Sequence, residues 1–150
     1  MTMNIRQVRK TEIDKVYDLE SHIFQPINYP LFVLRQFYDL MPELFLVAAD
    51  DSGHILGYTQ GGINIEEKVG WILSLATEEA HRRKGIGKQL SQKVIQLLWS
   101  KGVKNILLTV HPENTAASRL YHRIGFNIYQ EVADYYEDGE PRLVMELRKT

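Results

Sequence analysis

The sequence predicts a mixed α/β fold of the α+β type, in which helices flank one sheet of mixed strand direction. Two observations support this prediction. Short apolar or alternating segments with the period of a strand recur along the chain, and segments with helical period separate them. The expected order is β-α-α-β-β-β-α-β-α-β-β, without a linker or an internal repeat. The 150 residues therefore suit a single domain, residues 1–150, that can bury a core.

The first part of the chain is expected to contain one strand and two helices. NIRQVR (4–9) alternates and predicts a short strand, and Thr11 is expected to cap a helix over residues 11–24. FQPINYP (24–30) contains two prolines and predicts a loop. LFVLRQFYDLM (31–41) predicts a second helix, which ends before a proline.

The middle of the chain predicts three strands and the longest helix. LFLVAAD (44–50) and HILGYTQGGI (54–63) flank DDSG, which is a hairpin turn signal. KVGWILSLAT (68–77) is an apolar strand. IGKQLSQKVIQLLWSKG (86–102) has one apolar face at helical spacing, and Gly102 is expected to end that helix.

The last part predicts a strand, a helix and a terminal hairpin. NILLTV (105–110) is the strand, and residues 115–123 form the helix, with Gly125 just past its end. FNIYQEVADYY (126–136) and RLVMELR (142–148) are expected to pair as a hairpin around EDGEP.

Composition and charge exclude several classes of function. The formal net charge is -1, so the chain lacks the overall basic field of a non-specific nucleic-acid binder, and no nucleic-acid partner is expected. The absence of cysteine excludes disulfides, cysteine zinc sites and a cysteine nucleophile, and it fits a cytoplasmic location. No apolar run reaches membrane-spanning length, so no membrane partner is expected. The histidines lack metal-ligand spacing, so no metal is expected.

The segment HRRKGIGKQL (81–90) combines positive charge with Gly-Ile-Gly where the longest helix starts. Glycines let backbone N–H groups approach a ligand closely, and the first N–H groups of a helix lack intrahelical partners. This end of a helix is positive and attracts phosphate. Four basic side chains would add to the field: Arg82, Arg83, Lys84 and Lys88. The same residues could instead form a tight turn with a solvated basic face.

Two common phosphate-binding motifs do not fit this segment. A Walker loop needs glycine where Arg82 stands, and serine or threonine where Gln89 stands. A dinucleotide-binding fingerprint needs glycine at position 90, which is Leu90. The sequence therefore supports neither nucleotide hydrolysis nor hydride transfer.

RRKGIG (82–87) follows an apolar strand and matches the pattern Arg/Gln-x-x-Gly-x-Gly/Ala. It resembles the acetyl-CoA signature of the GNAT acetyltransferase superfamily. HPENTAASRLYHRIGF (111–126) resembles the second half of that signature at a fitting distance, and the resemblance covers nearly the whole chain. It implies a central mixed, mostly antiparallel sheet of about seven strands flanked by about four helices. It also implies acetyl-CoA as the acyl donor.

The resemblance also implies which residues bind the donor. In that family the strand before the loop pairs with the pantetheine arm through its backbone, and the diphosphate lies on the loop amides. An asparagine and a tyrosine contact the donor near its thioester. The implied donor-binding residues of this sequence are Leu75, Ala76, Thr77, Arg82, Arg83, Lys84, Gly85, Ile86, Gly87, Lys88, Asn114 and Tyr121.

Three further segments resemble N-terminal protein acetyltransferases, including the ribosomal-protein alanine acetyltransferases. They are IFQPINYP (23–30), DYYEDGE (134–140) and RLVMEL (142–147). By analogy the first two would form opposite walls of the acceptor site. The implied acceptor-binding residues are Phe24, Pro26, Ile27, Tyr29, Tyr135 and Tyr136. Phe24 and Ile27 could instead pack in the core, and the tyrosines could pack across the hairpin.

Acetyl transfer to an amine requires a neutral amine, a polarised thioester carbonyl and a stabilised or protonated thiolate. Without cysteine, direct attack within a ternary complex is the simplest scheme. Tyr121 is the candidate general acid, because the reference pKa of tyrosine is about 10 and that of a thiol about 8.5. Tyr121 also lies on an apolar stripe of its helix, so it could simply belong to the core.

The general base is where the resemblance ends. Related N-terminal acetyltransferases often have glutamate or histidine at the position of Thr109, and threonine cannot act as a base near neutral pH. His111 shares a strand face with Thr109 and is one candidate, although it could simply pack at the strand end. Glu66 and Glu67, at the start of the central strand, are the others.

Three functions remain open. The first is acetylation of the N-terminal α-amino group of a protein. The second is the same chemistry on a small amine, such as a polyamine, an amino sugar or an amino acid, which the threonine at position 109 favours. The third is a non-catalytic acetyl-CoA sensor. A homodimer is a possible assembly.

Overall fold

The computed structural model describes residues 2–24 and 27–150, and Pro26 lies outside the described residues. The described residues form seven strands: β1 (Met3–Gln7), β2 (Phe45–Asp50), β3 (Ile55–Asn64), β4 (Val69–Thr77), β5 (Asn105–Val110), β6 (Asn127–Val132) and β7 (Arg142–Arg148). The α-helices are α1 (Ile13–Ile23), α2 (Leu31–Leu40), α3 (Ile86–Ser100) and α4 (Thr115–Ile124). The predicted fold class and element order are confirmed. None of the helices in the described ranges has the length and apolar character needed to cross a bilayer.

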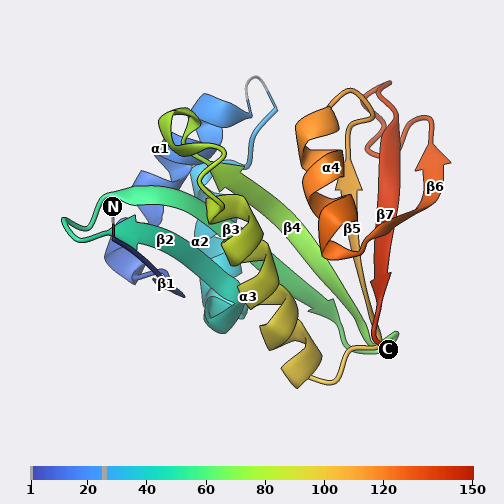
Figure 1. Ribbon diagram of the computed structural model, residues 1–150, viewed down its shortest axis with the longest axis horizontal. Coiled ribbons are helices and arrows are strands. Elements are labelled where there is room, and N and C mark those ends of the chain that lie inside the picture. The colour runs from blue at the N-terminus through green and yellow to red at the C-terminus, as the bar shows by residue number, and fades with distance from the viewer. Residues whose placement is uncertain (1, 25–26) are drawn as a thin grey trace.

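One sheet contains all seven strands, in the order β1-β2-β3-β4-β5-β7-β6. Every neighbouring pair is antiparallel except β4 and β5, which run parallel. These two strands pair only between Val69–Trp71 and Asn105–Leu107. Beyond this short ladder they diverge, and Figure 1 shows the opening widening toward the carboxyl ends of both strands.

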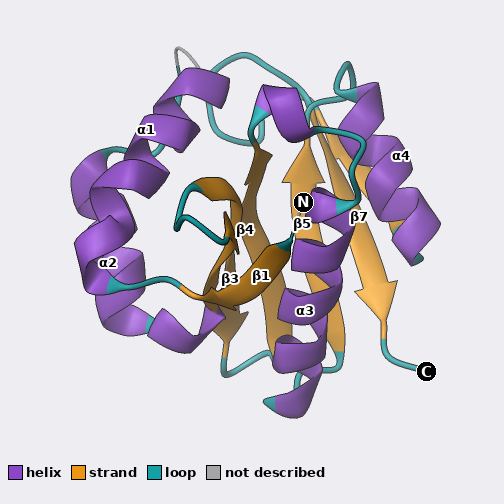
Figure 2. Cartoon of the chain, turned by 60° about the vertical axis from the view of Figure 1, so that its left-hand side comes forward, coloured by secondary structure: helices purple, strands orange, loops and turns teal. Residues whose placement is uncertain are grey.

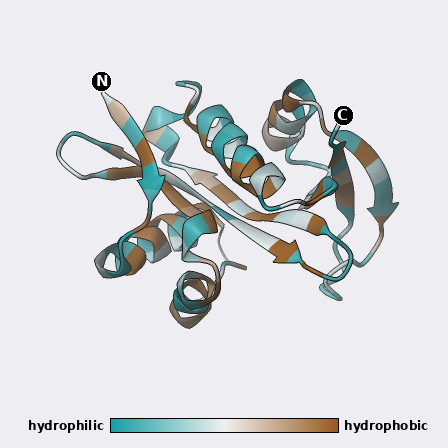
Figure 3. Ribbon diagram, turned by 90° about the horizontal axis from the view of Figure 1, so that it is seen from below, coloured by the Kyte–Doolittle hydropathy of each residue, from teal (hydrophilic) through white to brown (hydrophobic). Residues whose placement is uncertain are grey.

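Helices cover both faces of the sheet (Figure 2). On one face, α3 buries Ile86, Leu90 and Val94 in a cluster that also includes residues of β5 and α4. On the other face, Val16 of α1 and Leu34 of α2 pack in a second cluster. Hydrophobic residues accordingly gather along the strands and in the helices beside them (Figure 3).

Two glycines of β3 allow close packing beneath α3. A Cβ atom at Gly57 would lie 2.8 Å from the carbonyl oxygen of Ala76, and one at Gly61 would lie 2.9 Å from Cγ2 of Val94. Real Cβ atoms essentially never approach so closely, so larger residues at these positions would displace the helix or the neighbouring strand. The two glycines therefore help to fix the position of α3 against the centre of the sheet.

Two boundaries differ from the sequence-based expectation. Thr11 does not cap the first helix, because it lies inside a 3₁₀ turn over Lys10–Glu12. The strand expected over residues 126–136 ends at Val132, and residues 133–136 form a turn that leaves the sheet. The tyrosines of this segment therefore lie outside the regular hairpin.

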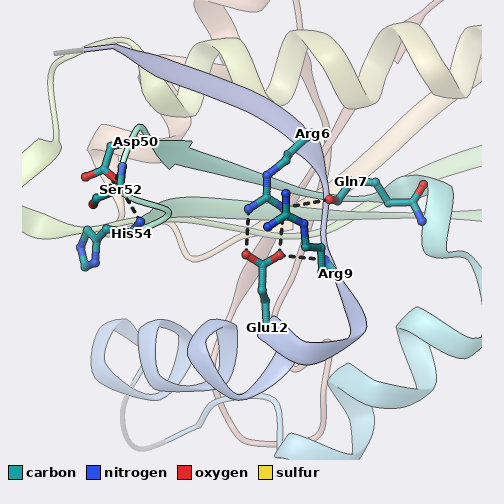
Figure 4. A network of polar contacts seen from close by, with 7 residues as sticks. All are labelled: Arg6, Gln7, Arg9, Glu12, Asp50, Ser52 and His54. Atoms are coloured by element: carbon teal, nitrogen blue, oxygen red, sulfur yellow. Dashed lines mark hydrogen bonds and ion pairs between the residues drawn. The ribbon is translucent and has the colours of Figure 1, made fainter.

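Glu12 stabilises the 3₁₀ turn that precedes α1. Its carboxylate accepts a hydrogen bond from the backbone amide of Arg9 at 2.8 Å, and it forms a paired contact with the Arg6 guanidinium at 2.7 and 2.8 Å (Figure 4). The Glu12 side chain is only 8% exposed. The hydrogen bonds from Arg6 lower the pKa of Glu12 from 4.5 to about 2.

We expect Glu12→Gln to lower the free energy of unfolding by about 1–3 kcal/mol at neutral pH, because a buried charged hydrogen bond is lost. Since folding depresses the pKa of Glu12, its contribution is complete above about pH 4.5 and is lost as pH falls through about 2. Urea unfolding at pH 7, 4 and 2.5 should therefore show the difference from wild type shrinking with acid.

Asp39→Asn is the control for this experiment, because its ion pair with Arg35 is about half exposed on both sides. This variant should change stability by less than about 1 kcal/mol at pH 7. A constant difference between Glu12→Gln and wild type across the whole pH range would contradict the assignment.

Candidate active site

A cleft of about 500 Å³ opens where β4 and β5 diverge. Its lining comes from α1, the α1–α2 loop, β4, β5, α4 and the loop between β6 and β7. Segments from both halves of the chain thus meet at one space, which the short β4–β5 ladder keeps open at the centre of the sheet.

The loop before α3 and the first turn of α3 present a run of free backbone amides, and this segment, residues 83–88, is called the amide loop below. Among the residues that the structure describes, the N–H groups from Arg83 to Lys88 have no hydrogen-bond acceptor. Arg83 has a φ of 70° and Gly85 a φ of 79°, a left-handed conformation that favours glycine. Consecutive amides in such a turn, at the positive end of a 15-residue helix, form an anion-binding concavity.

The amide loop adjoins the cleft through Gly87. A Cβ atom at Gly87 would lie 3.3 Å from Cδ2 of Leu120, 3.6 Å from Oγ1 of Thr77 and 3.7 Å from Cδ2 of Leu75. Leu75 itself lines the cleft. The anion-binding loop and the cleft are therefore neighbouring parts of one surface, which meet at the carboxyl end of β4.

The free edge of β4 links these two parts. Within the described part of the chain, residues 72–77 have no strand partner on the side of β5, whereas β3 pairs with their other edge. Of the three residues predicted to pair with pantetheine, Leu75 lines the cleft, Ala76 is buried and Thr77 ends the strand. The carbonyl oxygen of Thr77 lies 3.4 Å from Nε of Arg82, which ties the loop to the strand.

Tyr121 of α4 lines the cleft and is 6% exposed. Its ring packs edge-on against Phe126, with 5.6 Å between the ring centroids. Burial raises the pKa of Tyr121 above its ordinary value, so the hydroxyl stays protonated at neutral pH. Tyr121 therefore belongs to the core cluster and also borders the cleft, and its role as general acid stays a prediction.

Asn114 also lines the cleft, and it caps α4. Its Oδ1 atom accepts a hydrogen bond from the amide of Ala117 at 3.2 Å. The side-chain oxygen of Asn114 is thus occupied by the helix cap, whereas its side-chain NH₂ group remains as a donor for a ligand.

Thr109, which holds the position of the usual base, and the candidate base His111 both lie at the cleft. Thr109 lines the cleft, and its hydroxyl lies 2.8 Å from that of Tyr136. His111 also lines the cleft, but its Nδ1 atom accepts a hydrogen bond from the amide of Glu113 at 3.1 Å, and its Nε2 atom lies 3.7 Å from the carboxylate of Glu140. Its free lone pair is therefore already engaged, which does not favour a role as base.

Glu66 and Glu67 are not brought to the cleft, in contrast to the sequence-based hypothesis. They lie in the exposed turn between β3 and β4, at the opposite end of β4. At about 3.3 Å per strand residue, even Val69 is about 10 Å along β4 from Ile72, the first residue of that strand in the cleft lining. The turn therefore holds both carboxylates away from Tyr121.

The predicted acceptor walls are brought together in part. Phe24, Ile27 and Tyr29 line one side of the cleft, and Tyr136 lines the other. The Tyr29 hydroxyl donates a hydrogen bond to the carbonyl oxygen of Leu73 at 2.9 Å, which holds the α1–α2 loop against β4. Tyr135 is absent from the described lining, and its ring packs edge-on against that of Tyr136, with 4.7 Å between the ring centroids.

Three charged residues also line the cleft: Glu20, Asp138 and Arg142. Asp138 falls within the segment DYYEDGE (134–140) that was expected at the acceptor site, whereas Glu20 and Arg142 were not among the predicted site residues. Arg142 forms an ion pair with Asp138 at 3.1 Å and lies 5.3 Å from the ring centre of Tyr136. The sequence held one signal for Glu20, because this acidic residue falls at a helical spacing otherwise occupied by apolar residues of α1.

Comparisons with known proteins show the family to which this chain belongs. The family model described as "Acetyltransferase (GNAT) family" matches residues 13–126. An uncharacterized N-acetyltransferase of Methanocaldococcus jannaschii is 32% identical over 148 residues, which cover 98% of this chain and 92% of that protein. An N-alpha-acetyltransferase of Sulfurisphaera tokodaii is 30% identical over 154 residues, which cover 94% of this chain and 90% of that protein.

A solved structure supports the fold. A chain in the crystal structure of the NatC complex bound to Gag peptide and CoA superimposes with a TM-score of 0.91. The alignment covers 100% of both chains at 23% sequence identity. At this level of identity the likeness concerns the arrangement of helices and strands.

Proposed function

Because this chain belongs to the acetyltransferase (GNAT) family, we propose that it transfers an acetyl group from acetyl-CoA to the N-terminal α-amino group of a protein. The family and its N-acetyltransferase relatives make the chain an acyltransferase that acts on nitrogen. The proposal adds the donor and the class of acceptor. The observation that supports it most strongly is a single cleft that adjoins the amide loop and is also lined by two loops with aromatic residues. These are the α1–α2 loop, which contains Tyr29, and the β6–β7 loop, which contains Tyr136.

Acetyl-CoA fits the donor side of the cleft. The free amides from Arg83 to Lys88 offer hydrogen bonds to its diphosphate, and the exposed cations of the loop add a favourable field. The unpaired edge of β4 offers backbone groups to an extended arm that leads from this loop to Tyr121. When bound, the donor supplies an acetyl group on a thioester.

A protein N-terminus fits the acceptor side. Tyr29 and Tyr136 line the cleft from the α1–α2 loop and from the β6–β7 loop. One relative in Sulfurisphaera tokodaii is named as an N-alpha-acetyltransferase, and one solved relative is described as bound to a peptide and CoA. We infer that the two loops hold an extended peptide whose amine points toward the divergence of β4 and β5.

The residues of the cleft would act mainly by positioning the reactants. The loop amides and β4 would hold the donor, and the loops that contain Tyr29 and Tyr136 would hold the acceptor. The amine would bond to the carbonyl carbon as the C–S bond breaks, and Tyr121 would give its proton to the departing thiolate. The proton that the amine loses would return to Tyr121 by way of water. Burial raises the pKa of Tyr121, so its hydroxyl is a weaker acid than that of a free tyrosine. Proton transfer to the thiolate would therefore depend on close positioning of the two groups in the cleft.

The experiment that tests this function measures release of free thiol from acetyl-CoA with a panel of acceptors. The panel contains peptides with different first residues, the same peptides with a blocked N-terminus, spermidine, an amino sugar and free amino acids. We expect turnover with unblocked peptides and none with blocked ones. Turnover with spermidine but with no peptide would reject the proposed acceptor. Tight acetyl-CoA binding without turnover on any acceptor would favour a sensor.

We expect Tyr136→Phe to raise KM for the best peptide by about 2–10-fold, with kcat changed less than about twofold. The variant removes the 2.8 Å hydrogen bond to Thr109, and such a bond contributes about 0.5–1.5 kcal/mol. Thr109→Val removes the same bond from the other side and should have a similar effect. Steady-state kinetics with peptide and acetyl-CoA varied separately measure both effects.

The double variant provides the control, because the two changes remove one shared interaction. It should raise KM about as much as either single change. A double effect equal to the product of the single effects would show that Thr109 and Tyr136 act independently on the acceptor.

A further inference from the structure

Glu20, near the end of α1, is a buried carboxylate at the acceptor side of the cleft. It is 2% exposed and contributes to the cleft lining. Its Oε2 atom accepts a hydrogen bond from the amide of Tyr29 at 2.9 Å, and its Oε1 atom accepts hydrogen bonds from the hydroxyls of Tyr58 and Ser74, the latter at 3.2 Å. Burial and the nearby Glu20 charge raise the pKa of Tyr58, which therefore remains a donor.

The charge of Glu20 has no counter-charge in the described parts of the chain. The ion pairs formed there by arginine, lysine and histidine do not include Glu20. The cationic side chain of Arg142 also lines the cleft, but Asp138 is its partner. Glu12, the other buried glutamate, has Arg6 as its partner. A buried carboxylate without a cation is costly, and three neutral donors offset only part of that cost.

Through its hydrogen bonds, Glu20 joins Tyr29 of the α1–α2 loop to Ser74 of β4. The Ser74 hydroxyl lies 2.9 Å from that of Tyr58, and Ser74 lines the cleft between Leu73 and Leu75 of β4. A serine hydroxyl that donates to Glu20 keeps acceptor capacity of its own. The Ser74 hydroxyl can therefore donate a hydrogen bond to Glu20 and at the same time accept one from a donor group of a ligand in the cleft.

We propose that Glu20 is a positioning residue that recognises the positive charge of the acceptor amine, acting through the Ser74 hydroxyl and through its own field. This inference rests on the proposed function and adds how the enzyme selects its acceptor. The incoming ammonium supplies the counter-charge that the described residues lack, and it must then lose a proton to become the neutral amine that transfer requires. An amine is then drawn to the point where β4 and β5 diverge, while a blocked N-terminus is not.

The test compares two ligands that differ only in this charge. The first is the best peptide of the acceptor panel, and the second is its des-amino analogue, in which hydrogen replaces the α-amino group. Binding of each to the full chain is measured by calorimetry in the presence of CoA, so that no transfer occurs. We expect the wild type to prefer the charged peptide by at least 10-fold, and Glu20→Gln to reduce this preference to less than about twofold.

A purely structural role for Glu20 predicts a different result. If Glu20 only fastened the α1–α2 loop through the amide of Tyr29, Glu20→Gln would weaken both ligands by the same factor and leave the preference intact. That outcome, or a wild type that binds both ligands equally, overturns the inference. Glu12→Gln is the matched control, because it removes a buried carboxylate that does not line the cleft, and it should keep the full preference.

Ser74→Ala keeps the inference testable if Glu20→Gln does not fold. This change removes the proposed link to the ligand while the carboxylate keeps Tyr29 and Tyr58 as donors. We expect it to reduce the preference for the charged peptide by about threefold or more, and an unchanged preference would contradict the inference. A wild type that acetylates small amines but no peptide would reject the proposed function alone, since the same charge comparison then uses that amine and its uncharged analogue.

Discussion

Tyr121→Phe should lower kcat by about 100-fold or more while acetyl-CoA binding changes less than about twofold. Positioned proton transfer contributes about 10²–10⁴-fold to rates of this kind, and the substitution removes only the hydroxyl. The ring remains and keeps its edge-on contact with Phe126, so the core beneath the cleft should stay intact. Pre-steady-state and steady-state thiol release, together with calorimetric titration of CoA, measure the two quantities.

Tyr135→Phe is the matched control for this substitution. Burial also raises the pKa of Tyr135, but this residue packs against Tyr136 and is absent from the described lining of the cleft. Its hydroxyl should therefore be dispensable for turnover. An unaltered kcat in Tyr121→Phe would remove Tyr121 from the chemical step and leave it a packing residue.

Gly85→Asp should weaken acetyl-CoA binding by about 100-fold. Gly85 is the N-cap of α3, and a side chain there would enter open space, with Nε2 of Gln89 at 3.9 Å as the nearest atom. The substitution places a negative charge beside the free amides of the loop. A carboxylate within a few ångströms of a diphosphate is strongly unfavourable, and the left-handed φ of 79° adds a smaller backbone cost.

Gly85→Asn separates these two effects, because asparagine has nearly the same shape and the same backbone cost without the charge. It should weaken binding by only about 5-fold. Raising the salt concentration from about 0.05 to about 0.5 M shortens the electrostatic screening length severalfold. The difference in acetyl-CoA affinity between the two variants should therefore become smaller at high salt. Equal losses for both would mean that the loop does not hold the diphosphate.

Local signals predicted most of the fold. Gly102 follows α3 with a φ of 87°, and Gly125 follows α4 with a φ of 125°, as expected for residues that end helices. The start of α1 was misplaced because capping preference favours threonine, whereas the contact that decides this turn comes from Arg6 on β1. The end of β6 was misplaced because residues that are common in strands, including two tyrosines, continue into residues 133–136, although these residues leave the sheet.

The candidate site was predicted where motifs are contiguous and missed where tertiary contacts define it. The glycines of the loop and Tyr121 lie in recognisable patterns, so their neighbourhood could be expected from the sequence. The place of Glu20 in the site could not be predicted, because its partners Tyr58 and Ser74 are 38 and 54 residues away, in β3 and β4. Glu67 was a poor candidate for the same reason, since only the three-dimensional path of β4 places it at the far end of the strand.

The β4–β5 ladder has a mechanical consequence. Three residues on each strand form the only strand pairing that joins β1–β4 to β5–β7 within the described residues. Tyr29 and the amide loop come from the part of the chain that contains β1–β4. Thr109 and Tyr121 come from the part that contains β5–β7. A ligand that touches both groups therefore adds cross-links that the backbone itself lacks. Amide hydrogen exchange in β5 and β7 should slow more on formation of the ternary complex than on binding of either ligand alone.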